Sequence, residues 1–189
     1  MTIIKQWLII FFLSAIASLS FAATPEWEII PEKSKITFTG IQNDAPVSGS
    51  FKKFSGVILF DLNQLTNNKV QITIDMNSVS TSFSDLTSTL ITSDWFDVTV
   101  FPNATFEAHH FKKISDKQYE AEGSLTIRNK TIPVILKFLA TELPNNEARV
   151  EGMTTLKRTA FGVGQGEWAD TSSVKDDVQV NFLITAKKK

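Results

Sequence analysis

The segment from Tyr119 to Arg128 alternates without a break between two kinds of residue. One set of alternate positions reads Tyr, Ala, Gly, Leu and Ile, and the other reads Glu, Glu, Ser, Thr and Arg. A period of two places these sets on opposite faces of a β-strand, one dry and one solvated. Such strands are typical of antiparallel sheets. A chain made of them must stack two sheets or close one sheet into a barrel, whose inward side chains can enclose a ligand.

The same pattern recurs along most of the chain, with no long helix between the repeats. In residues 70–76 and 178–182, for example, apolar positions alternate with polar ones. Ten short strands at nearly regular spacing predict an all-β fold, either a sandwich or a barrel. The expected strands cover residues 26–30, 34–41, 47–51, 56–62, 70–76, 104–111, 118–127, 131–141, 148–157 and 178–185.

A short connection and a proline indicate details of the strand arrangement. Residues 128–130 join two expected strands directly, so these strands should form a hairpin. Asn129, at its centre, tolerates the left-handed conformation that a tight turn needs. Pro133 lacks an amide hydrogen and therefore marks an edge, a bulge or the first residues of a strand.

One segment, residues 82–97, is not strand-like. Phe83, Leu86, Leu90 and Ile91 recur at the spacing of a helix face, and Ser84 is a candidate N-cap. A short amphipathic helix here would lie across one end of the sheet. It would either plug the mouth of a barrel or act as a lid over a ligand, and both interpretations stay open.

The N-terminus has the three-part layout of a secretory signal peptide. Lys5 precedes an almost unbroken apolar run over residues 7–17, and Ser20-Phe21-Ala22 supplies the small residues of a cleavage site. A retained membrane anchor is the alternative, but the run is short for a span of about 20 residues. We therefore expect residues 1–22 to be removed and residues 23–189 to form one domain.

The chain has no cysteine and a formal net charge of −1. A chain of this size can build its core without disulfides, and it offers no N-terminal cysteine for lipid modification. We expect a soluble mature protein, which in a Gram-negative cell means the periplasm. The balanced charge does not favour a nucleic-acid partner, which usually needs a concentrated basic face. The basic run at residues 187–189 reads as a solvated tail.

Catalytic and metal-binding patterns are weak. His109 and His110 are adjacent in an expected strand and should point to opposite faces, so they could not share a metal ion. The glycines of residues 162–166 lack the spacing of a phosphate loop and indicate a flexible connection. Asp94 and Asp97 could be paired carboxylates, although capping and turn roles explain them more simply. The sequence therefore predicts no metal and no cofactor.

The whole chain has 15 phenylalanines and one tyrosine. Phenylalanine supplies a large apolar surface with no hydroxyl group to satisfy. Such a composition suits a dry cavity for a hydrocarbon ligand, and it equally suits a packed core. The cavity interpretation requires a barrel that is wide enough to leave space inside.

Several segments together resemble the YceI family of periplasmic lipocalin-like proteins. The resemblance implies an extended eight-stranded antiparallel barrel with a short helix near one mouth and a long apolar lumen. It also implies a polyisoprenoid or related amphiphilic lipid as ligand, frequent dimers, and no known catalytic residues. Many relatives have histidine where this chain has Lys33, which puts head-group preference in doubt. The matching segments are PEKSKITF from Pro31, VSGSF from Val47, FSG from Phe54, SVST from Ser78, SDWFD from Ser93, Phe101-Pro102 with Phe106, GSLTI from Gly123, TIPV from Thr131 and RTAFG from Arg158.

The leading hypothesis is thus a periplasmic carrier of a long apolar lipid, a polyisoprenoid or an isoprenoid quinone, that acts without catalysis and can form a homodimer. The alternatives are a structural or stress-related barrel without ligand, and a hydrolase that uses Asp94 and Asp97. Arg158 and Lys157 are candidates to meet a head group, although solvent exposure is the simpler expectation for each. The expected ligand contacts are Phe38, Ile72, Ile74, Phe106, Leu125, Ile127, Phe138 and Phe182 in the lumen, and Trp95, Phe96 and Phe161 at the mouth.

Overall fold

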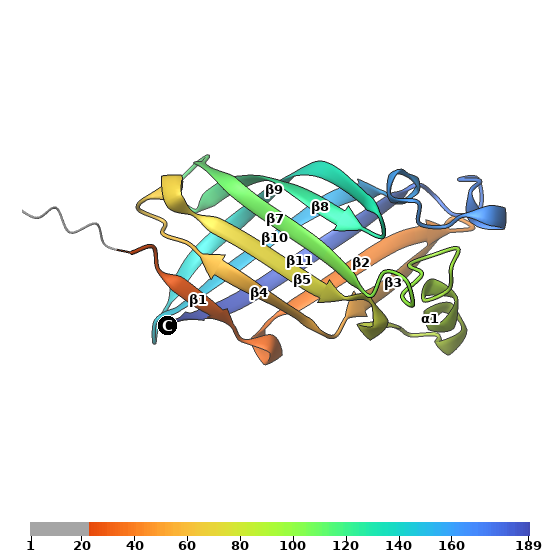
Figure 1. Cartoon of the computed structure of the whole chain (residues 1–189), viewed down its shortest axis with the longest axis horizontal. Helices are drawn as coiled ribbons and strands as arrows, with labels where there is room; N and C mark the ends of the chain where they lie inside the picture. The colour runs from red at the N-terminus through yellow and green to blue at the C-terminus, as the bar shows by residue number, and fades with distance from the viewer. Residues whose placement is uncertain (1–22) are drawn as a thin grey trace, which may run out of the picture.

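The structure, a computed structural model, describes residues 23–189, and the expected signal peptide at residues 1–22 lies outside the described residues. The described chain forms eleven β-strands in one antiparallel sheet and one short helix, α1 (Ser84–Leu90) (Figure 1). The strands are β1 (Glu26–Ile29), β2 (Lys35–Gln42), β3 (Ala45–Phe51), β4 (Phe54–Leu59), β5 (Lys69–Asp75), β6 (Val79–Thr81), β7 (Asn103–Lys113), β8 (Gln118–Ile127), β9 (Lys130–Leu143), β10 (Glu147–Lys157) and β11 (Asp177–Lys188).

Three pairs of strands are halves of longer, interrupted strands. β1 and β2 both pair with β11, and a 3-10 turn, Pro31–Lys33, separates them. β3 pairs with β2 and β4 pairs with β1, and two residues separate β3 from β4. β5 pairs with β4 and β6 pairs with β3, and the turn Met76–Ser78 separates β5 from β6. Counting each pair once gives eight strands, and the sheet closes because β1 pairs with both β4 and β11. The predicted eight-stranded antiparallel barrel is confirmed, whereas the ten expected strands missed β6.

The hairpin between β8 and β9 is confirmed, but its left-handed residue is Arg128 (φ 54°) and not Asn129. The Arg128 side chain is fixed by contacts to residues 93–97, and these contacts offset the cost of an unusual backbone conformation. Pro133 lies in an edge region, as expected. It pairs with Ser124 of β8, while β10 pairs with β9 only from Lys137 onward.

A β-bulge in β7 corrects the prediction for the two histidines. The register with β8 shifts between Ala108 and His110, so one extra residue is inserted at His109. Both histidines are exposed, whereas Ala108 and Phe111 on either side of them are directed inward. The two imidazoles therefore do not take opposite faces. Within residues 23–189 no three side chains of metal-ligating type form a cluster.

Helix α1 lies at one end of the barrel, as the sequence predicted (Figure 1). Ser84 is its first helical residue, so it is not the N-cap; Phe83 has that position and makes no side-chain cap. The hydroxyl of Thr81 instead accepts the amide hydrogen of Phe83. No helix within the described range has the length and apolar character needed to cross a membrane.

Candidate functional site

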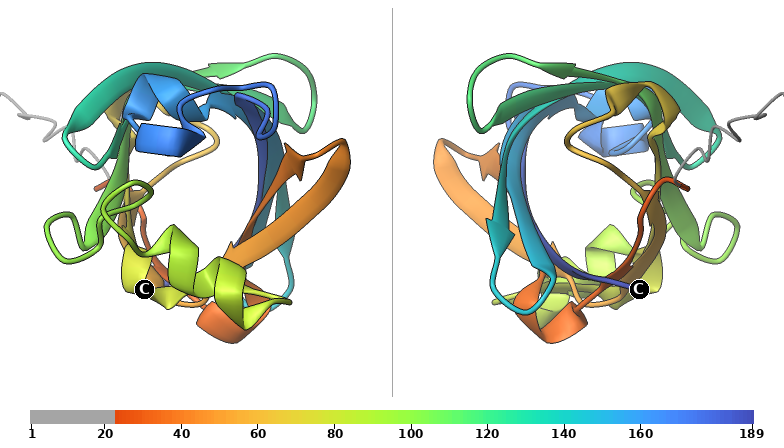
Figure 2. Two further views of the ribbon diagram at one scale, coloured as in Figure 1. Left: turned by 90° about the vertical axis from the view of Figure 1, so that its right-hand side faces the viewer. Right: turned by 90° about the vertical axis from the view of Figure 1, so that its left-hand side faces the viewer.

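The interior of the barrel contains two apolar hollows. We call them the terminal hollow, of about 200 Å³, and the helical hollow, of about 520 Å³. β1 and the last residues of β11 line the terminal hollow, and α1 lines the helical hollow. Figures 1 and 2 show α1 at the opposite end of the barrel from β1 and the end of β11. Both hollows include in their walls the same five side chains, which we call the waist, so the two hollows adjoin along one lumen. The waist consists of Ile36, Ile74, Leu125, Leu156 and Val180.

The strand alternation explains why the lumen is apolar. Along β9, Val134 and Leu136 line the terminal hollow, while Ile135 between them is 56% exposed on the outer wall. On β8, Ala121 and Leu125 face the same hollow. Of the side chains lining the terminal hollow, only Thr141 and Thr154 are polar. Every strand except β6 thus contributes side chains to the walls of the two hollows.

Two glycines allow aromatic rings to lie flat against the wall. A Cβ atom on Gly49 would meet Cζ of Phe38 at 2.4 Å, and one on Gly152 would meet Cζ of Phe182 at 2.6 Å. Each phenylalanine pairs across the sheet with its glycine, so its ring covers the space that a side chain would fill. The two rings therefore pack against the barrel wall and do not fill the lumen.

The structure places all twelve predicted ligand residues on the walls of the two hollows. That they contact a ligand stays a prediction. Ile74 and Leu125 belong to the waist, the terminal hollow has Ile72, Phe106, Phe138 and Phe182, and the helical hollow has Phe38, Trp95, Phe96, Ile127, Arg158 and Phe161.

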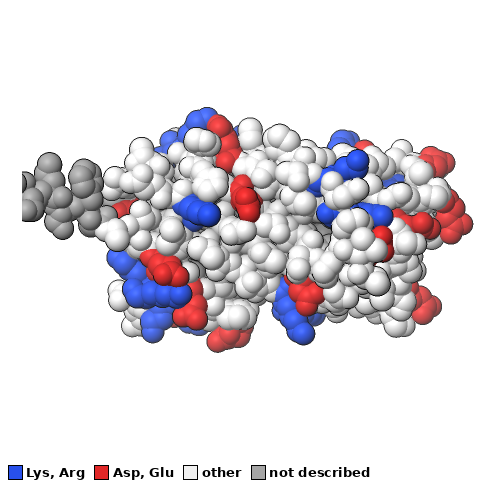
Figure 3. Space-filling model, viewed as in Figure 1, with Lys and Arg blue, Asp and Glu red and all other residues white. Residues whose placement is uncertain are grey.

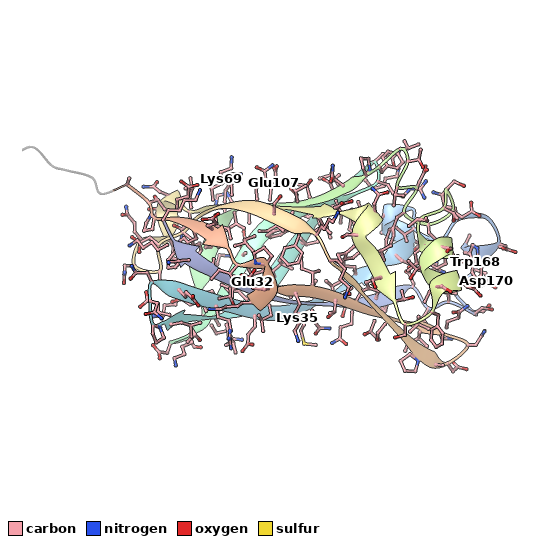
Figure 4. The ribbon with its side chains drawn as sticks, turned by 90° about the horizontal axis from the view of Figure 1, so that it is seen from below. Glu32, Lys35, Lys69, Glu107, Trp168 and Asp170 are labelled. Atoms are coloured by element: carbon pink, nitrogen blue, oxygen red, sulfur yellow. The ribbon has the colours of Figure 1, made fainter. Side chains whose placement is uncertain are left out.

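Sequence reasoning missed several wall residues. Val180 and Ile36 belong to alternating strands, and the same pattern could have identified them. Phe111 could not be found in this way, because the bulge at His109 reverses the inward face of β7. Trp168 ends the 3-10 turn Gly166–Trp168, where no strand periodicity exists, and Figure 4 shows it at the same end of the barrel as α1.

Arg158 is neither exposed nor available to a head group. It is 4% exposed and lines the helical hollow, but its guanidinium donates five hydrogen bonds to backbone carbonyls. These bonds use every N–H that the group has. Burial lowers the pKa of Arg158, and the nearby Asp176 carboxylate opposes that shift. The five acceptors belong to Val163, Gly164, Asp170, Val174 and Lys175.

The other basic candidates lie outside the lumen. Lys157 is an exposed partner of Asp177 (2.6 Å) and lines neither hollow. Lys33, where the resemblance implied a histidine in many relatives, binds Glu147 at 2.9 Å and also lines neither hollow. The suggested head-group contacts by Arg158 and Lys157 therefore find no support in the geometry.

The glycine loop of residues 162–166 packs closely against Asp94 and Arg158, so the expected flexible connection is not what the structure shows. Gly162, Gly164 and Gly166 have positive φ angles. The amides of Gly164 and Gln165 donate to the carbonyl oxygen of Asp94 at 2.8 and 2.7 Å. A Cβ on Gly164 would come within 2.2 Å of Nη1 of Arg158, so only glycine fits against the guanidinium.

The two aspartates of the hydrolase alternative do not form a lumen site. The Asp97 carboxylate pairs with Arg128 at 3.6 Å, and the Asp94 carbonyl accepts the two loop amides. Neither residue lines either hollow. Both fasten the segment after α1 to neighbouring turns, which agrees with the simpler role expected for them.

A closed antiparallel barrel with a dry, incompletely filled interior is the architecture of lipocalin-like barrels, which can enclose one small ligand. The chain belongs to the family of the YceI-like domain, whose model matches residues 27–186. The predicted family membership is confirmed.

Known relatives and structures agree with this membership. A UPF0312 protein of Pseudomonas paraeruginosa is 33% identical over 120 residues, which cover 61% of this chain and 62% of that protein. Protein YceI of Salmonella arizonae is 36% identical over 89 residues, which cover 47% of this chain and 46% of that protein. The crystal structure of BcnA from Burkholderia cenocepacia has a TM-score of 0.80 at 33% identity and covers 84% of this chain and 99% of that one.

One more distant structure is described as a polyisoprenoid binding domain, from Saccharophagus degradans, implicated in plant cell wall breakdown. It has a TM-score of 0.71 at 14% identity and covers 89% of this chain and 100% of that one. At this identity the likeness concerns the fold alone.

Proposed function

We propose that this protein binds and carries a long apolar lipid, a polyisoprenoid or an isoprenoid quinone, in the lumen of its barrel. The observation that carries the proposal is the pair of adjoining hollows whose walls are almost entirely apolar. The polyisoprenoid binding described for the Saccharophagus degradans domain suggests the lipid class.

The physical basis is the removal of hydrocarbon from water. Each buried CH₂ group contributes about 0.8 kcal/mol. A chain of some tens of carbons then exceeds the free energy of about 4–15 kcal/mol that association and ordering consume. Because the wall has few polar groups, discrimination between lipids comes mainly from the length and width of the lumen.

A carrier fits the described residues better than a hydrolase. Asp94 and Asp97, the carboxylates considered for catalysis, lie outside both hollows, and Asp97 is paired with Arg128. A barrel filled by its own side chains fits less well, because the helical hollow keeps about 520 Å³ of space.

The cargo can be identified directly. The mature protein is purified gently, extracted with organic solvent, and the extract is analysed by mass spectrometry. We expect a prenyl lipid at a stoichiometric level, and uptake of an added prenol by the delipidated protein. Repeated recovery of clean protein together with no uptake of prenyl lipids would disprove a carrier.

Leu125→Lys tests the lumen itself. Leu125 belongs to the waist, so a charged side chain there should abolish uptake of a prenol because an unpaired charge is expensive to bury. The matched control is Ile135→Lys on the outer wall, which should bind normally. Circular dichroism checks that both variants fold. If Leu125→Lys does not fold, Leu125→Trp, which adds apolar volume at the waist, should reduce uptake of long chains; normal uptake by a folded waist variant contradicts the proposal.

We also propose that residues 1–22 direct the protein to the periplasm and are removed there. The test is N-terminal sequencing of the protein recovered from the periplasmic fraction, which should begin at Ala23. A protein that stays in the cytoplasmic fraction with Met1 in place would refute the assignment.

A further inference from the structure

Two tryptophans at opposite ends of the lumen differ in one hydrogen bond. Trp27 lines the terminal hollow, and its indole N–H donates to the carbonyl oxygen of Phe60 at 2.8 Å. Trp95 lines the helical hollow and is 8% exposed. Among residues 23–189, Nε1 of Trp95 is the one buried side-chain polar atom that has no hydrogen-bond partner.

An unpaired buried donor is uncommon, because a polar group removed from water without a new partner destabilises the folded state. Packing around this indole is otherwise close: Trp168 lies 5.6 Å from it between ring centroids, and the Trp95 carbonyl accepts a hydrogen bond from Arg128 at 2.6 Å. The residue is therefore fixed at the wall of the helical hollow with one unused donor.

The electrostatic surroundings favour an electron-rich partner. The Cζ atom of Arg158 lies 5.8 Å from the centroid of the Trp95 ring. The guanidinium bonds only to carbonyl oxygens, so no carboxylate neutralises it by direct contact. Its positive charge therefore acts on this part of the wall, although it has no N–H left to donate.

The two hollows also differ in polarity. The polar side chains of the terminal hollow are two threonines, Thr141 and Thr154. The helical hollow is larger, and its walls include Gln42, Asp85 and Arg158. A lipid with one polar end is therefore better accommodated with that end in the helical hollow and its tail directed through the waist.

We propose that the helical hollow receives the oxygen-bearing end of the lipid, and that the Trp95 indole N–H donates a hydrogen bond to a neutral carbonyl or hydroxyl oxygen there. This inference rests on the proposed carrier function. A phosphate end is disfavoured, because Arg158 has no donor left for it and the Asp85 carboxylate lies on the same wall. Neighbouring atoms cover Nε1 in this structure, so contact with an acceptor requires the side chains around the indole to shift.

The test compares three ligands with one hydrocarbon chain: geranylgeraniol, geranylgeranyl phosphate and the hydrocarbon of the same chain. The native protein should bind the alcohol most tightly. Trp95→Phe should weaken binding of the alcohol about tenfold, which is the value of one hydrogen bond, and leave the hydrocarbon unchanged. Trp27→Phe is the matched control at the other end, where the indole already has a partner, and it should not change the preference for the alcohol over the hydrocarbon.

Proton–nitrogen NMR of the native protein measures the indole N–H chemical shifts directly and does not depend on a substitution at Trp95. The indole N–H signal of Trp95 should move downfield with geranylgeraniol and not with the hydrocarbon, while that of Trp27 stays in place. Equal losses for alcohol and hydrocarbon in Trp95→Phe, or equal shifts with both ligands, would overturn the inference and leave the carrier function intact. A native protein that binds none of the three ligands would overturn both.

Discussion

At the residue scale, Arg158 shows how one buried cation organises a loop. Its five N–H groups bind carbonyls of residues 163–175, a segment with little regular structure to pair its own backbone. The sequence placed Arg158 near the mouth but could not distinguish a ligand contact from a loop contact. Carbonyl oxygens occur at every residue, so the sequence carries no specific signal for such partners.

Arg158→Lys should therefore destabilise the protein even though it keeps the charge. A lysine ammonium has three donors on one point and cannot match five carbonyls around a planar guanidinium. We expect the free energy of unfolding to fall by about 2 kcal/mol, as for the loss of buried hydrogen bonds to a charged group. Urea denaturation measures this. Lys157→Ala, at the exposed neighbour, serves as the control and should change stability little; an equal loss in both variants would contradict the role given to Arg158.

Asp176 gives a prediction about pH. Burial alone would raise the pKa of its carboxyl, but hydrogen bonds from the amide and hydroxyl of Thr159, together with the positive charges of Lys157 and Arg158, outweigh burial and lower that pKa. A carboxyl with a lowered pKa stabilises the fold above its unfolded pKa of about 4, and this contribution is lost as the pH falls through the folded pKa. Asp176→Asn should thus be less stable than the native protein at neutral pH, and the difference should shrink in acid. Urea denaturation over a pH series checks this; a difference independent of pH would exclude the carboxylate as its cause.

At the scale of elements, the interrupted strands depend on a serine hydroxyl. Oγ of Ser78 accepts the amide hydrogens of Lys52 and Lys53 at 3.1 and 2.9 Å and donates to the carbonyl oxygen of Asp75 at 2.6 Å. It thereby joins the break between β3 and β4 to the break between β5 and β6. Without this hydroxyl, the Lys53 amide and the Asp75 carbonyl, at the two strand interruptions, would each lose a hydrogen-bond partner.

Ser78→Ala should lower the free energy of unfolding by about 1–2 kcal/mol, because the Lys53 amide loses its acceptor. The measurement is thermal or urea denaturation of both proteins. Ser88→Ala is the matched control, since Ser88 is exposed on α1 and alanine favours a helix. If Ser78→Ala proves as stable as Ser88→Ala, the hydroxyl does not hold the breaks together.

At the scale of the whole molecule, alternation predicted an antiparallel all-β fold and twelve of the side chains on the lumen walls, because each inward face must be apolar along its entire length. The choice of a barrel over a sandwich came from the resemblance to the YceI family. Alternation did not predict how the chain departs from regularity. The bulge at His109 and the three strand interruptions change which residues face inward, and they depend on long-range pairing that a local pattern does not contain. On the face shown in Figure 3, Lys and Arg side chains lie among Asp and Glu side chains over most of the surface, while Asp and Glu predominate at the right-hand end.

The width of the lumen depends on the Phe38 ring packing against the wall at Gly49, and Gly49→Ala tests this dependence. A new Cβ would meet Cζ and Cε1 of Phe38 at 2.4 and 2.7 Å, so the ring must turn away from the wall. Phe51 already packs against that ring at 5.6 Å between centroids, and the space available to it is the helical hollow. The variant should fold and yet bind a long prenol about tenfold more weakly, which corresponds to the loss of contact with one or two CH₂ groups.

Gly40→Ala is the matched control for this change. Gly40 lines the same hollow, and a Cβ there would find its nearest neighbour, Cγ2 of Val178, at an ordinary distance of 3.9 Å. Isothermal titration with one prenol compares the two variants with the native protein. Binding should weaken in Gly49→Ala alone, since only there is a ring displaced into the lumen. Equal affinities in all three proteins would mean that the space for the lipid does not depend on Phe38 resting against Gly49, and that the width of the lumen is set by the backbone of the barrel.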